Sequence, residues 1–468
     1  MLTRRELLKH SSAGFGYLAL AGMSNHGREA FGAEVANGAE VTAAHPLAPK
    51  QPHFAGQAKR VIFLCMQGGP SHVDTFDYKP DLLKDHGKRA KYGGSLLKSP
   101  WKFRQHGESG LWVSDLFPQV ATHADDLCLI RSMHCDQPVH PGAMTQMHTG
   151  TAQFVRPSIG AWTLYGLGTE NESLPGFVSL SPPAGSSRNY GSAFLPAIYG
   201  GTKVGRTGSR FAQAARFAGG AQESVPDIKN PTLDAREQRR QLNFIQKLNR
   251  SQMPDGDTAH VEGVIQSYEL AFKMQDAMPS LMDLSDEDER TLKAYGADGG
   301  PTATFGKQCL LARRFAEAGV RFIEITHGNW DQHNRLTEDH AARAEACDGP
   351  IAALLADLKS RDMLDETLVI WGGEFGRTPS AQNGDGRNHN NKGYTLWMAG
   401  GGVKGGYSYG ATDEHGFEAV ENPCHVHDWH ATVLHLLGLD HEQLTYRYAG
   451  RDFRLTDVYG NVVHDIIA

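Results

Sequence analysis

Three apolar segments of the chain each lead into side chains of the types that bind metal ions. The segments and the groups that follow them are 320–326 with Asp331 and His333, 367–371 with Glu374 and Arg377, and 61–65 with Ser71 and Asp74. Ligands of open α/β sheets bind at the carboxyl ends of the strands, so we expect these side chains to meet in one crevice. Carboxylates and imidazoles gathered there indicate a metal-assisted hydrolase.

Asp331 and His333 are the first pair of candidate ligands. Residues two apart in an extended loop can face the same side, so one carboxylate and one imidazole can reach one ion. Zn²⁺ accepts this mixture of oxygen and nitrogen ligands, with bonds of about 2.0–2.2 Å. The alternative is a polar loop with an Asx-turn at Asp331 and a solvated histidine.

Three further positions extend the predicted site. Glu374 is a candidate metal ligand, and Arg377 is placed to grip an oxyanion with two hydrogen bonds, unless the two simply form an ion pair. His389 lies in a loop rich in glycine and asparagine before a strand, which suits a ligand. Asp74 is either a ligand or a helix cap, and Ser71 a possible nucleophile.

Other histidines and the cysteines favour structural roles. His427 and His430 lie near Asp428 in an amphipathic run, so a packed helix start is favoured over a second metal site. Six cysteines are scattered without a Cys-x-x-Cys pair, which argues against a cysteine-rich zinc site. Cys65 and Cys128 lie inside apolar runs, where cysteine behaves as a small buried hydrophobe.

Alternating strand and helix patterns must position the candidate ligands. We predict strands at 61–67, 127–131, 320–326, 367–372 and 395–399, and helices at 301–319, 337–358 and 428–437. This alternation predicts a mostly parallel sheet covered by helices on both faces. Residues 200–300 differ, because two charged helical segments, 234–252 and 259–278, follow a region without strands. They are interpreted as an insertion or cap rather than an independent domain.

Composition and the N-terminus limit the possible partners. The chain has 468 residues and a net charge of −7, which gives no basic surface for nucleic acid. No stretch is apolar for long enough to span a bilayer stably. A twin arginine, Arg4-Arg5, before a weakly apolar segment predicts a Tat signal peptide at 1–33, followed by a disordered linker at 34–54 and one α/β domain at 55–468. The mature protein is therefore expected in the periplasm or outside the cell, after handling by the Tat export machinery.

With these motifs the chain resembles the DUF1501 family of Tat-exported proteins, within the alkaline phosphatase and sulfatase superfamily. The stretches that carry the resemblance are 67–71, 74–77, 330–333, 373–379, 387–389, 399–406 and 450–453. The resemblance implies an alkaline phosphatase-like three-layer α/β/α sandwich with a metal site at the strand ends. Asp331 and His333 look like the Asp/His ligand pair of superfamily phosphatases, and His389 is similar to their last histidine ligand.

The sequence also departs from the superfamily pattern. Phe375 stands where a histidine ligand would be, which puts a second metal in doubt, and the Cys-x-Pro-Ser-Arg motif of sulfatases is absent. His140 aligns near the nucleophile position instead. A hydroxyl such as Thr145 or Ser71 then attacks, a metal-activated water does, or the site is no longer catalytic.

Together these observations predict an exported metal-dependent hydrolase. One or two divalent ions, zinc first and calcium or another ion as alternatives, would be held by Asp331, His333, Glu374 and His389, with Asp74 as a further ligand. The substrate would be a small phosphate or sulfate ester, such as a phosphorylated or sulfated saccharide. The alternative is a non-catalytic binding or envelope protein that keeps the fold. An exported oxidoreductase is disfavoured, because no dinucleotide fingerprint is present.

Overall fold

The computed structural model describes residues 46–183, 186–205, 225, 228–230, 232–251 and 258–468. The predicted signal peptide and the first part of the predicted linker lie outside these residues. Residues 46–54, the end of that linker, instead pack against the body of the protein. The backbone N–H of Lys50 donates to the carbonyl of Leu167 at 2.9 Å, and its ammonium donates to the carbonyl of Tyr165 at 2.6 Å. Burial lowers the pKa of Lys50 to about 8.

Within the described residues, nine strands form the central sheet, eight of them in the order β12-β4-β11-β8-β1-β7-β5-β6, with β15 also paired to β4. Their bounds are β1 Arg60–Met66, β4 Leu127–His134, β5 Phe177–Leu180, β6 Thr202–Val204, β7 Phe322–His327, β8 Thr367–Gly372, β11 Tyr394–Ala399, β12 Tyr407–Tyr409 and β15 Cys424–His425. Only β11 runs antiparallel to its neighbours, β4 and β8. The mostly parallel sheet predicted from the alternating pattern is therefore confirmed.

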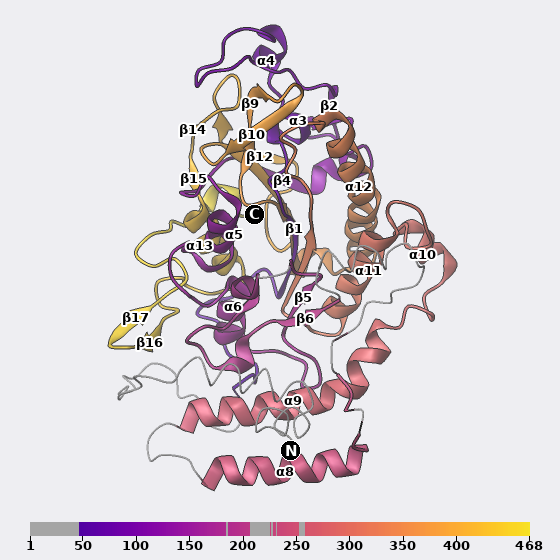
Figure 1. Ribbon diagram of the computed structural model, residues 1–468, viewed down its shortest axis with the longest axis vertical. Helices are drawn as coiled ribbons and strands as arrows, with labels where there is room; N and C mark the ends of the chain where they lie inside the picture. The colour runs from indigo at the N-terminus through magenta and orange to yellow at the C-terminus, as the bar shows by residue number, and fades with distance from the viewer. Residues whose placement is uncertain (1–45, 184–185, 206–224, 226–227, 231, 252–257) are drawn as a thin grey trace, which may run out of the picture.

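Helices cover both faces of the sheet, which gives the expected three layers (Figure 1). One layer holds α5 His140–Thr149, α6 Ile159–Leu167 and α13 Val426–Leu436. The other holds α11 Ala303–Glu317 and α12 Leu336–Ser360. Gly319 follows α11 with φ +84°, a backbone angle that glycine adopts without steric cost and that is common just after a helix.

Strand β1 shows how the sheet divides the core into two apolar layers. Its wholly buried residues alternate, so that Ile62 and Leu64 pack with α11 and α12, whereas Phe63 and Cys65 pack with α6 and α13. A strand that is apolar on both faces is typical of a parallel sheet buried between two helical layers.

A pair of long helices lies at the end of the molecule opposite strands β9 Gly376–Gln382 and β10 Gly386–Asn390 (Figure 1). They are α8 Ala235–Ser251 and α9 Thr258–Met282, close to the two helical segments predicted for the insertion. The short helix α10 Glu289–Ala294 follows them. Among the described residues no helix is both long and apolar enough to cross a bilayer.

Smaller elements lie around the sheet. The β9–β10 hairpin, Gly376–Gln382 with Gly386–Asn390, forms its own two-stranded sheet beside α3 His72–Thr75. Further short α-helices and strands are α4 Pro80–Lys84, β2 Phe103–His106, β3 Leu111–Ser114, β13 Ala411–Thr412, β14 Ala419–Glu421, β16 Tyr446–Tyr448 and β17 Arg451–Phe453.

Candidate metal centre

Asp331 and His333 lie in the loop that leaves β7 at the carboxyl end of the sheet. The loop is anchored by Trp330, whose wholly buried indole N–H donates to His327 Nδ1 at 3.0 Å. Gly68, in the turn after β1, approaches this loop so closely that a Cβ there would lie 2.7 Å from the backbone nitrogen of Trp330. With φ at +112°, the position also requires the conformational freedom of glycine. The turns after β1 and β7 therefore fix the backbone that carries Asp331.

His389 reaches the same place from the β9–β10 hairpin. In the hairpin register it is paired with Arg377, which is wholly buried. The guanidinium of Arg377 donates from Nη2 to Asp331 Oδ1 at 2.6 Å and from Nε to the carbonyl of Gly69 at 2.9 Å. It also donates to the carbonyl of Gly68. Arg377 thus holds Asp331 in position from beneath, and its hydrogen-bonding capacity is engaged within the protein.

His140, the first residue of α5, completes the group from the third side. Its Nδ1 lies 2.6 Å from Glu374 Oε1. The Glu374 carboxylate is buried and also accepts the backbone N–H of Gly68, at 3.0 and 3.1 Å to its two oxygens. Glu374 therefore orients the imidazole of His140, as the carboxylate partners of metal-binding histidines do.

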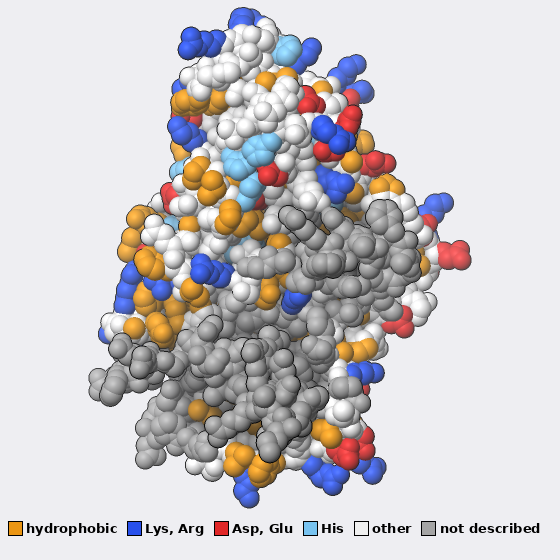
Figure 2. All heavy atoms as spheres, in the orientation of Figure 1, with side chains coloured by type: hydrophobic (Ala, Val, Ile, Leu, Met, Phe, Trp, Pro, Cys, Tyr) orange, Lys and Arg blue, Asp and Glu red, His pale blue; other side chains and the backbone are white. Residues whose placement is uncertain are grey.

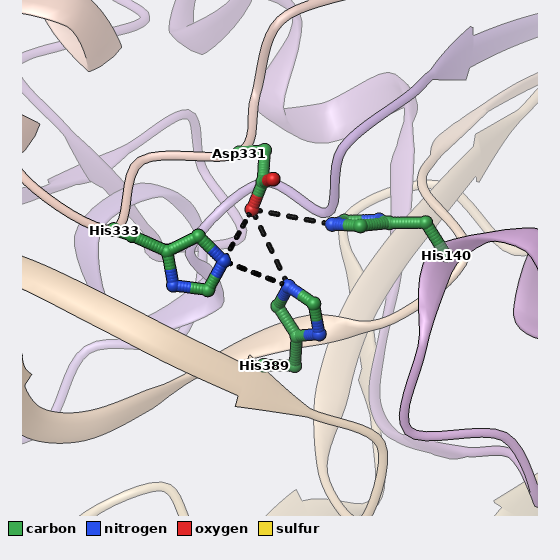
Figure 3. Close-up of side chains that lie close together, drawn as sticks. All are labelled: His140, Asp331, His333 and His389. Carbon is green, nitrogen blue, oxygen red and sulfur yellow. Dashed lines mark hydrogen bonds and ion pairs between the residues drawn. The ribbon is translucent and has the colours of Figure 1, made fainter.

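Three imidazole side chains converge on Asp331 Oδ1, which lies 2.9 Å from His333 Nε2, 3.2 Å from His140 Nε2 and 3.3 Å from His389 Nε2 (Figure 3). His333 Nε2 and His389 Nε2 are 3.0 Å apart. One ligand atom from each of the four residues lies within 4.8 Å of the others. We refer to His140, Asp331, His333 and His389 as the histidine cluster. Asp331 is exposed and the three histidines are partly exposed, so the cluster opens to solvent. A group of histidine side chains is visible on this face of the molecule (Figure 2).

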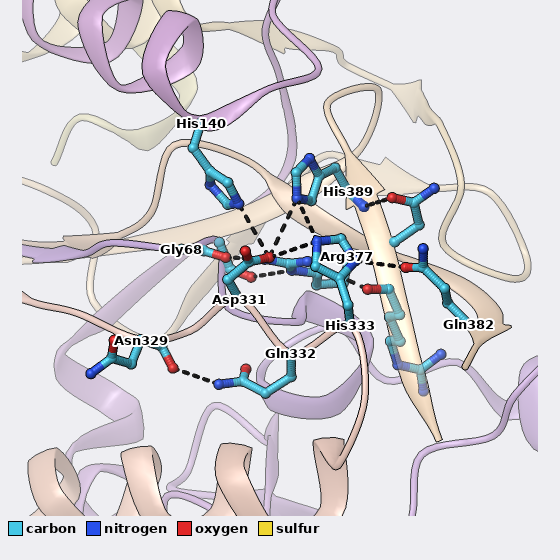
Figure 4. Close-up of polar contacts among 12 residues, drawn as sticks. Gly68, His140, Asn329, Asp331, Gln332, His333, Arg377, Gln382 and His389 are labelled. Carbon is cyan, nitrogen blue, oxygen red and sulfur yellow. Dashed lines mark hydrogen bonds and ion pairs between the residues drawn. The ribbon is translucent and has the colours of Figure 1, made fainter. Parts of the chain in front are cut away.

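The hydrogen bonds of the three rings determine where their protons lie. Each Nδ1 faces an atom that can only accept: the Glu374 carboxylate for His140, the amide oxygen of Gln382 for His333 at 2.7 Å, and the carbonyl of Pro138 for His389 at 2.9 Å. The contact between His333 and Gln382 is drawn in Figure 4. Each Nδ1 therefore carries a proton, and in the neutral ring the lone pair lies on Nε2.

Three Nε2 lone pairs and a carboxylate oxygen thus face one another. These four atoms repel one another unless a cation or extra protons lie between them. His140 Nε2 is buried and faces Asp331 Oδ1 at 3.2 Å. Three imidazole nitrogens with one carboxylate oxygen form a ligand set that suits Zn²⁺ and related divalent ions. The residues present therefore fit a divalent metal ion.

The pKa values of Asp331 and His140 also indicate that the cluster favours a positive charge at its centre. Burial opposes the charge on Asp331, but hydrogen bonds from His140 and His389 and the nearby Arg377 hold its pKa well below the usual range. Burial would lower the pKa of His140, yet its hydrogen bonds to Asp331 and Glu374 raise that pKa to about 9. Without an ion, the cluster therefore holds a proton on His140 at neutral pH, in the place a cation would take.

This proton predicts how metal binding depends on pH. An ion that binds His140 Nε2 must displace a proton whose pKa is about 9, while Asp331 stays ionised. Apparent affinity should therefore rise roughly tenfold per pH unit from pH 7 toward pH 9 and then level off. Titration calorimetry in buffers of different ionisation enthalpy measures the proton released.

Glu374→Gln removes a charge that raises the pKa of His140. In this variant the increase in metal affinity should therefore occur at lower pH. An affinity unchanged between pH 7 and pH 9 would exclude His140 as a ligand.

Other residues of the predicted site have different partners. Asp74 is wholly buried in an ion pair with Arg387, at 2.6 Å, and accepts the Ser71 hydroxyl at 2.5 Å. The half-buried Thr145 donates its hydroxyl to the carbonyl of Pro141 at 2.8 Å. Asp74 thus takes no part in the histidine cluster, and its charge is already balanced by Arg387. Neither Ser71 nor Thr145 presents its hydroxyl proton to the cluster.

His140 was predicted near the nucleophile position and not as a ligand. Its place in the cluster depends on α5 packing over the strand ends, and the chain gives only a weak local signal for it: a histidine at the start of a helix, before Pro141. Phe375 is 1% exposed and its ring centroid lies 4.7 Å from those of both His140 and His389. An aromatic ring thus packs against the cluster beside Glu374.

The histidines at the start of α13 have structural partners, as predicted. His425 caps α13, with the reciprocal hydrogen bonds of a capping box to Asp428. His427 Nε2 and His430 Nε2 lie 2.8 and 2.7 Å from backbone carbonyls of Gly150 and Met147. All six cysteines are buried free thiols.

A mostly parallel α/β sandwich with a polar cluster at its strand ends defines the class of this protein. The sequence matches the family described as "Protein of unknown function (DUF1501)" over residues 58–467, and the chain belongs to that family. No curated protein sequence matches the chain.

Solved structures with a similar chain include a sulfatase, a phosphonate ester hydrolase and an alkaline phosphatase. The PsFucS1 sulfatase from Pseudoalteromonas sp. is 12% identical, with 82% of this chain and 68% of that chain covered and a TM-score of 0.35. The phosphonate monoester hydrolase from Silicibacter pomeroyi is 12% identical, with 81% and 73% covered and a TM-score of 0.33. TAB5 alkaline phosphatase is 11% identical, with 74% and 92% covered and a TM-score of 0.32.

Proposed function

We propose that this protein is a metal-dependent hydrolase of phosphate or sulfate esters. The observation that carries the proposal is the convergence of three imidazole Nε2 atoms and Asp331 Oδ1 at a solvent-accessible rim of the sheet. When bound, a divalent ion such as Zn²⁺ would act as a Lewis acid that polarises the ester. Calcium is a weaker candidate, because it prefers a shell made wholly of oxygen ligands.

The chain's own residues would hold and orient the reacting groups. His140, His333, His389 and Asp331 supply the ligand atoms. Glu374 and Gln382 fix the rings of His140 and His333 through Nδ1, and Arg377 fixes the Asp331 carboxylate. Because these partners are themselves held by the protein, the ligand atoms are preorganised and would need little rearrangement during a reaction.

The attacking group in this proposal is a water molecule from solvent. The Ser71 hydroxyl is committed to Asp74, and the Thr145 hydroxyl is committed to its own helix. The side chain of Asp331 is 42% exposed, so water and an ester group both have access to the cluster. An opening at the surface, rather than a closed pocket, suits an ester carried on a bulky group such as a phosphorylated or sulfated saccharide.

A second candidate is a non-catalytic binding or envelope protein with the same fold. It is favoured by Phe375, which packs against His140 and His389, and by the engagement of Arg377 with Asp331 and the carbonyls of Gly68 and Gly69. Among the described residues, Arg377 is the arginine that forms an ion pair with Asp331.

An activity screen separates the two functions. Purified protein loaded with Zn²⁺ should hydrolyse an aryl phosphate or an aryl sulfate, and activity should disappear on chelation and return when the ion is restored. His389→Ala should be inactive, whereas His106→Ala, which alters a histidine of β2 outside the cluster, should keep full activity. If the protein with bound ion hydrolyses neither ester class, the result would favour the non-catalytic binding protein.

We also propose that the Tat machinery exports the protein to the periplasm or beyond. The support is the Arg4-Arg5 pair ahead of a weakly apolar segment. Replacing both arginines with lysine should retain the protein in the cytoplasm, as measured by immunoblots of cell fractions. Unchanged export of this double variant would contradict the proposal.

A further inference from the structure

A second group of ligand-type side chains is buried beneath the histidine cluster. Cys65 on β1, His148 on α5 and Glu324 on β7 each offer one ligand atom, and these atoms lie within 4.8 Å of one another. Cys65 and His148 are wholly buried, and Glu324 is 1% exposed. We refer to these three residues as the buried triad.

The apolar surroundings make a carboxylate at this position costly. Glu324 lies beside Phe63 in the parallel register of β1 and β7, and Cys65 lies beside Thr326. Both Glu324 and Cys65 therefore face the layer that holds α5, where most neighbours are apolar, although Ser179 and Thr326 also lie beside Glu324. A buried charge is stable there only when it is paired with an opposite charge or binds a metal ion.

The hydrogen bonds of the triad leave ligand atoms without sufficient partners. His148 Nδ1 lies 2.7 Å from the carbonyl of Met144, which can only accept, so Nδ1 carries a proton and Nε2 faces Glu324 Oε1 at 3.2 Å. That bond to a backbone carbonyl is typical of histidines that bind metal through Nε2. Within the described residues, the buried Glu324 Oε2 has no hydrogen-bond partner at all.

We propose that Cys65, His148 and Glu324 form a second metal site, which takes a thiophilic divalent ion such as Zn²⁺. A thiolate, an imidazole and a carboxylate are accepted together by Zn²⁺, whereas Mg²⁺ and Ca²⁺ prefer oxygen ligands alone. Binding would release the Cys65 thiol proton and any proton on His148 Nε2. The ion's two positive charges would then balance the thiolate and the carboxylate.

Two of the three elements that carry the buried triad, α5 and β7, also position ligands of the histidine cluster. Helix α5 carries His140 at its first residue and His148 near its last, β1 carries Cys65 and leads to Gly68, and β7 carries Glu324 and leads to Asp331. An ion in the buried triad would join α5 to the two central strands directly below the histidine cluster. Its role is structural, because all three ligands are inaccessible to a substrate. The inference stands whether or not the histidine cluster hydrolyses esters.

Sulfur distinguishes the two sites experimentally, because the histidine cluster contains only nitrogen and oxygen ligands. The test uses full-length His389→Ala protein, in which the surface site is impaired, with metal content measured by mass spectrometry and the ligands by X-ray absorption. We expect about one ion per chain to remain, with sulfur scattering at about 2.3 Å. Cys65→Ala should abolish that scattering, whereas Cys128→Ala, which removes an equally buried thiol on β4, should not.

The outcomes separate this site from the proposed function. Bound ion with only nitrogen and oxygen neighbours, or no ion in His389→Ala protein that remains folded by circular dichroism, would overturn the buried site. If Cys65→Ala does not fold, Co²⁺ substituted into His389→Ala protein gives the same answer. A thiolate-to-cobalt charge-transfer band is expected, and its absence with the ion bound would exclude Cys65 as a ligand.

Discussion

Replacing His389 with alanine should lower the affinity of the histidine cluster for Zn²⁺ at least about 100-fold. Loss of a partner that only orients a ligand costs 10–100-fold in affinity, so loss of a ligand should cost no less. The effect should be large because His389 Nε2 lies within 3.3 Å of both Asp331 Oδ1 and His333 Nε2. Titration calorimetry at pH 8 measures the change.

His106→Ala is the matched control for this experiment. His106 is a half-buried histidine at the end of β2 and is not part of either group of ligand-type residues. It should bind Zn²⁺ as the unaltered protein does. Equal affinity in His389→Ala and His106→Ala would mean that the four residues of the cluster do not share an ion, and the proposed hydrolase would lose its basis.

Replacing Asp74 with alanine should destabilise the fold by about 3–5 kcal/mol. Asp74 and Arg387 are both wholly buried and form two hydrogen bonds, Nε to Oδ2 at 2.6 Å and Nη2 to Oδ1 at 3.0 Å. Without the carboxylate, the Arg387 charge would remain buried without its partner. Urea-induced unfolding, followed by circular dichroism, measures the loss.

Asp85→Ala provides the comparison, because the Asp85 ion pair with Lys88 lies at the surface and should contribute about 0–1 kcal/mol. Since Arg387 is two residues from His389 on β10, Asp74→Ala should also weaken Zn²⁺ binding. A loss of stability no larger than that of Asp85→Ala would show that Arg387 finds another partner or reaches solvent.

Much of the fold could be predicted because its signals are local. The apolar runs at 61–67, 320–326 and 367–372 became β1, β7 and β8 at the centre of the sheet, and each ends within a few residues of its expected position. Once these strands are parallel neighbours, the rule that ligands gather at their carboxyl ends places Asp331 correctly. His333 follows it in the same loop.

The parts that could not be predicted depend on contacts between distant segments. Nothing near Asp74 indicates that Arg387 neutralises it, because the two are 313 residues apart. Glu374 has the position expected of a ligand, but its oxygens are used by Gly68 and His140, which approach from other elements. Glu324 did offer a local signal: a carboxylate in the middle of an otherwise apolar strand needs a buried partner.

The β9–β10 hairpin is separate from the nine-stranded sheet, yet it supplies His389 to a cluster whose other members come from α5 and the loop after β7. A shared ion would add to the backbone hydrogen bond from the Arg387 N–H to the carbonyl of Gln332, at 3.1 Å, in holding these parts together. At 100 times its dissociation constant, such an ion would stabilise the closed arrangement by about 2.7 kcal/mol. At low metal concentration, the β9–β10 hairpin would therefore separate from the loop after β7 before the central sheet is affected.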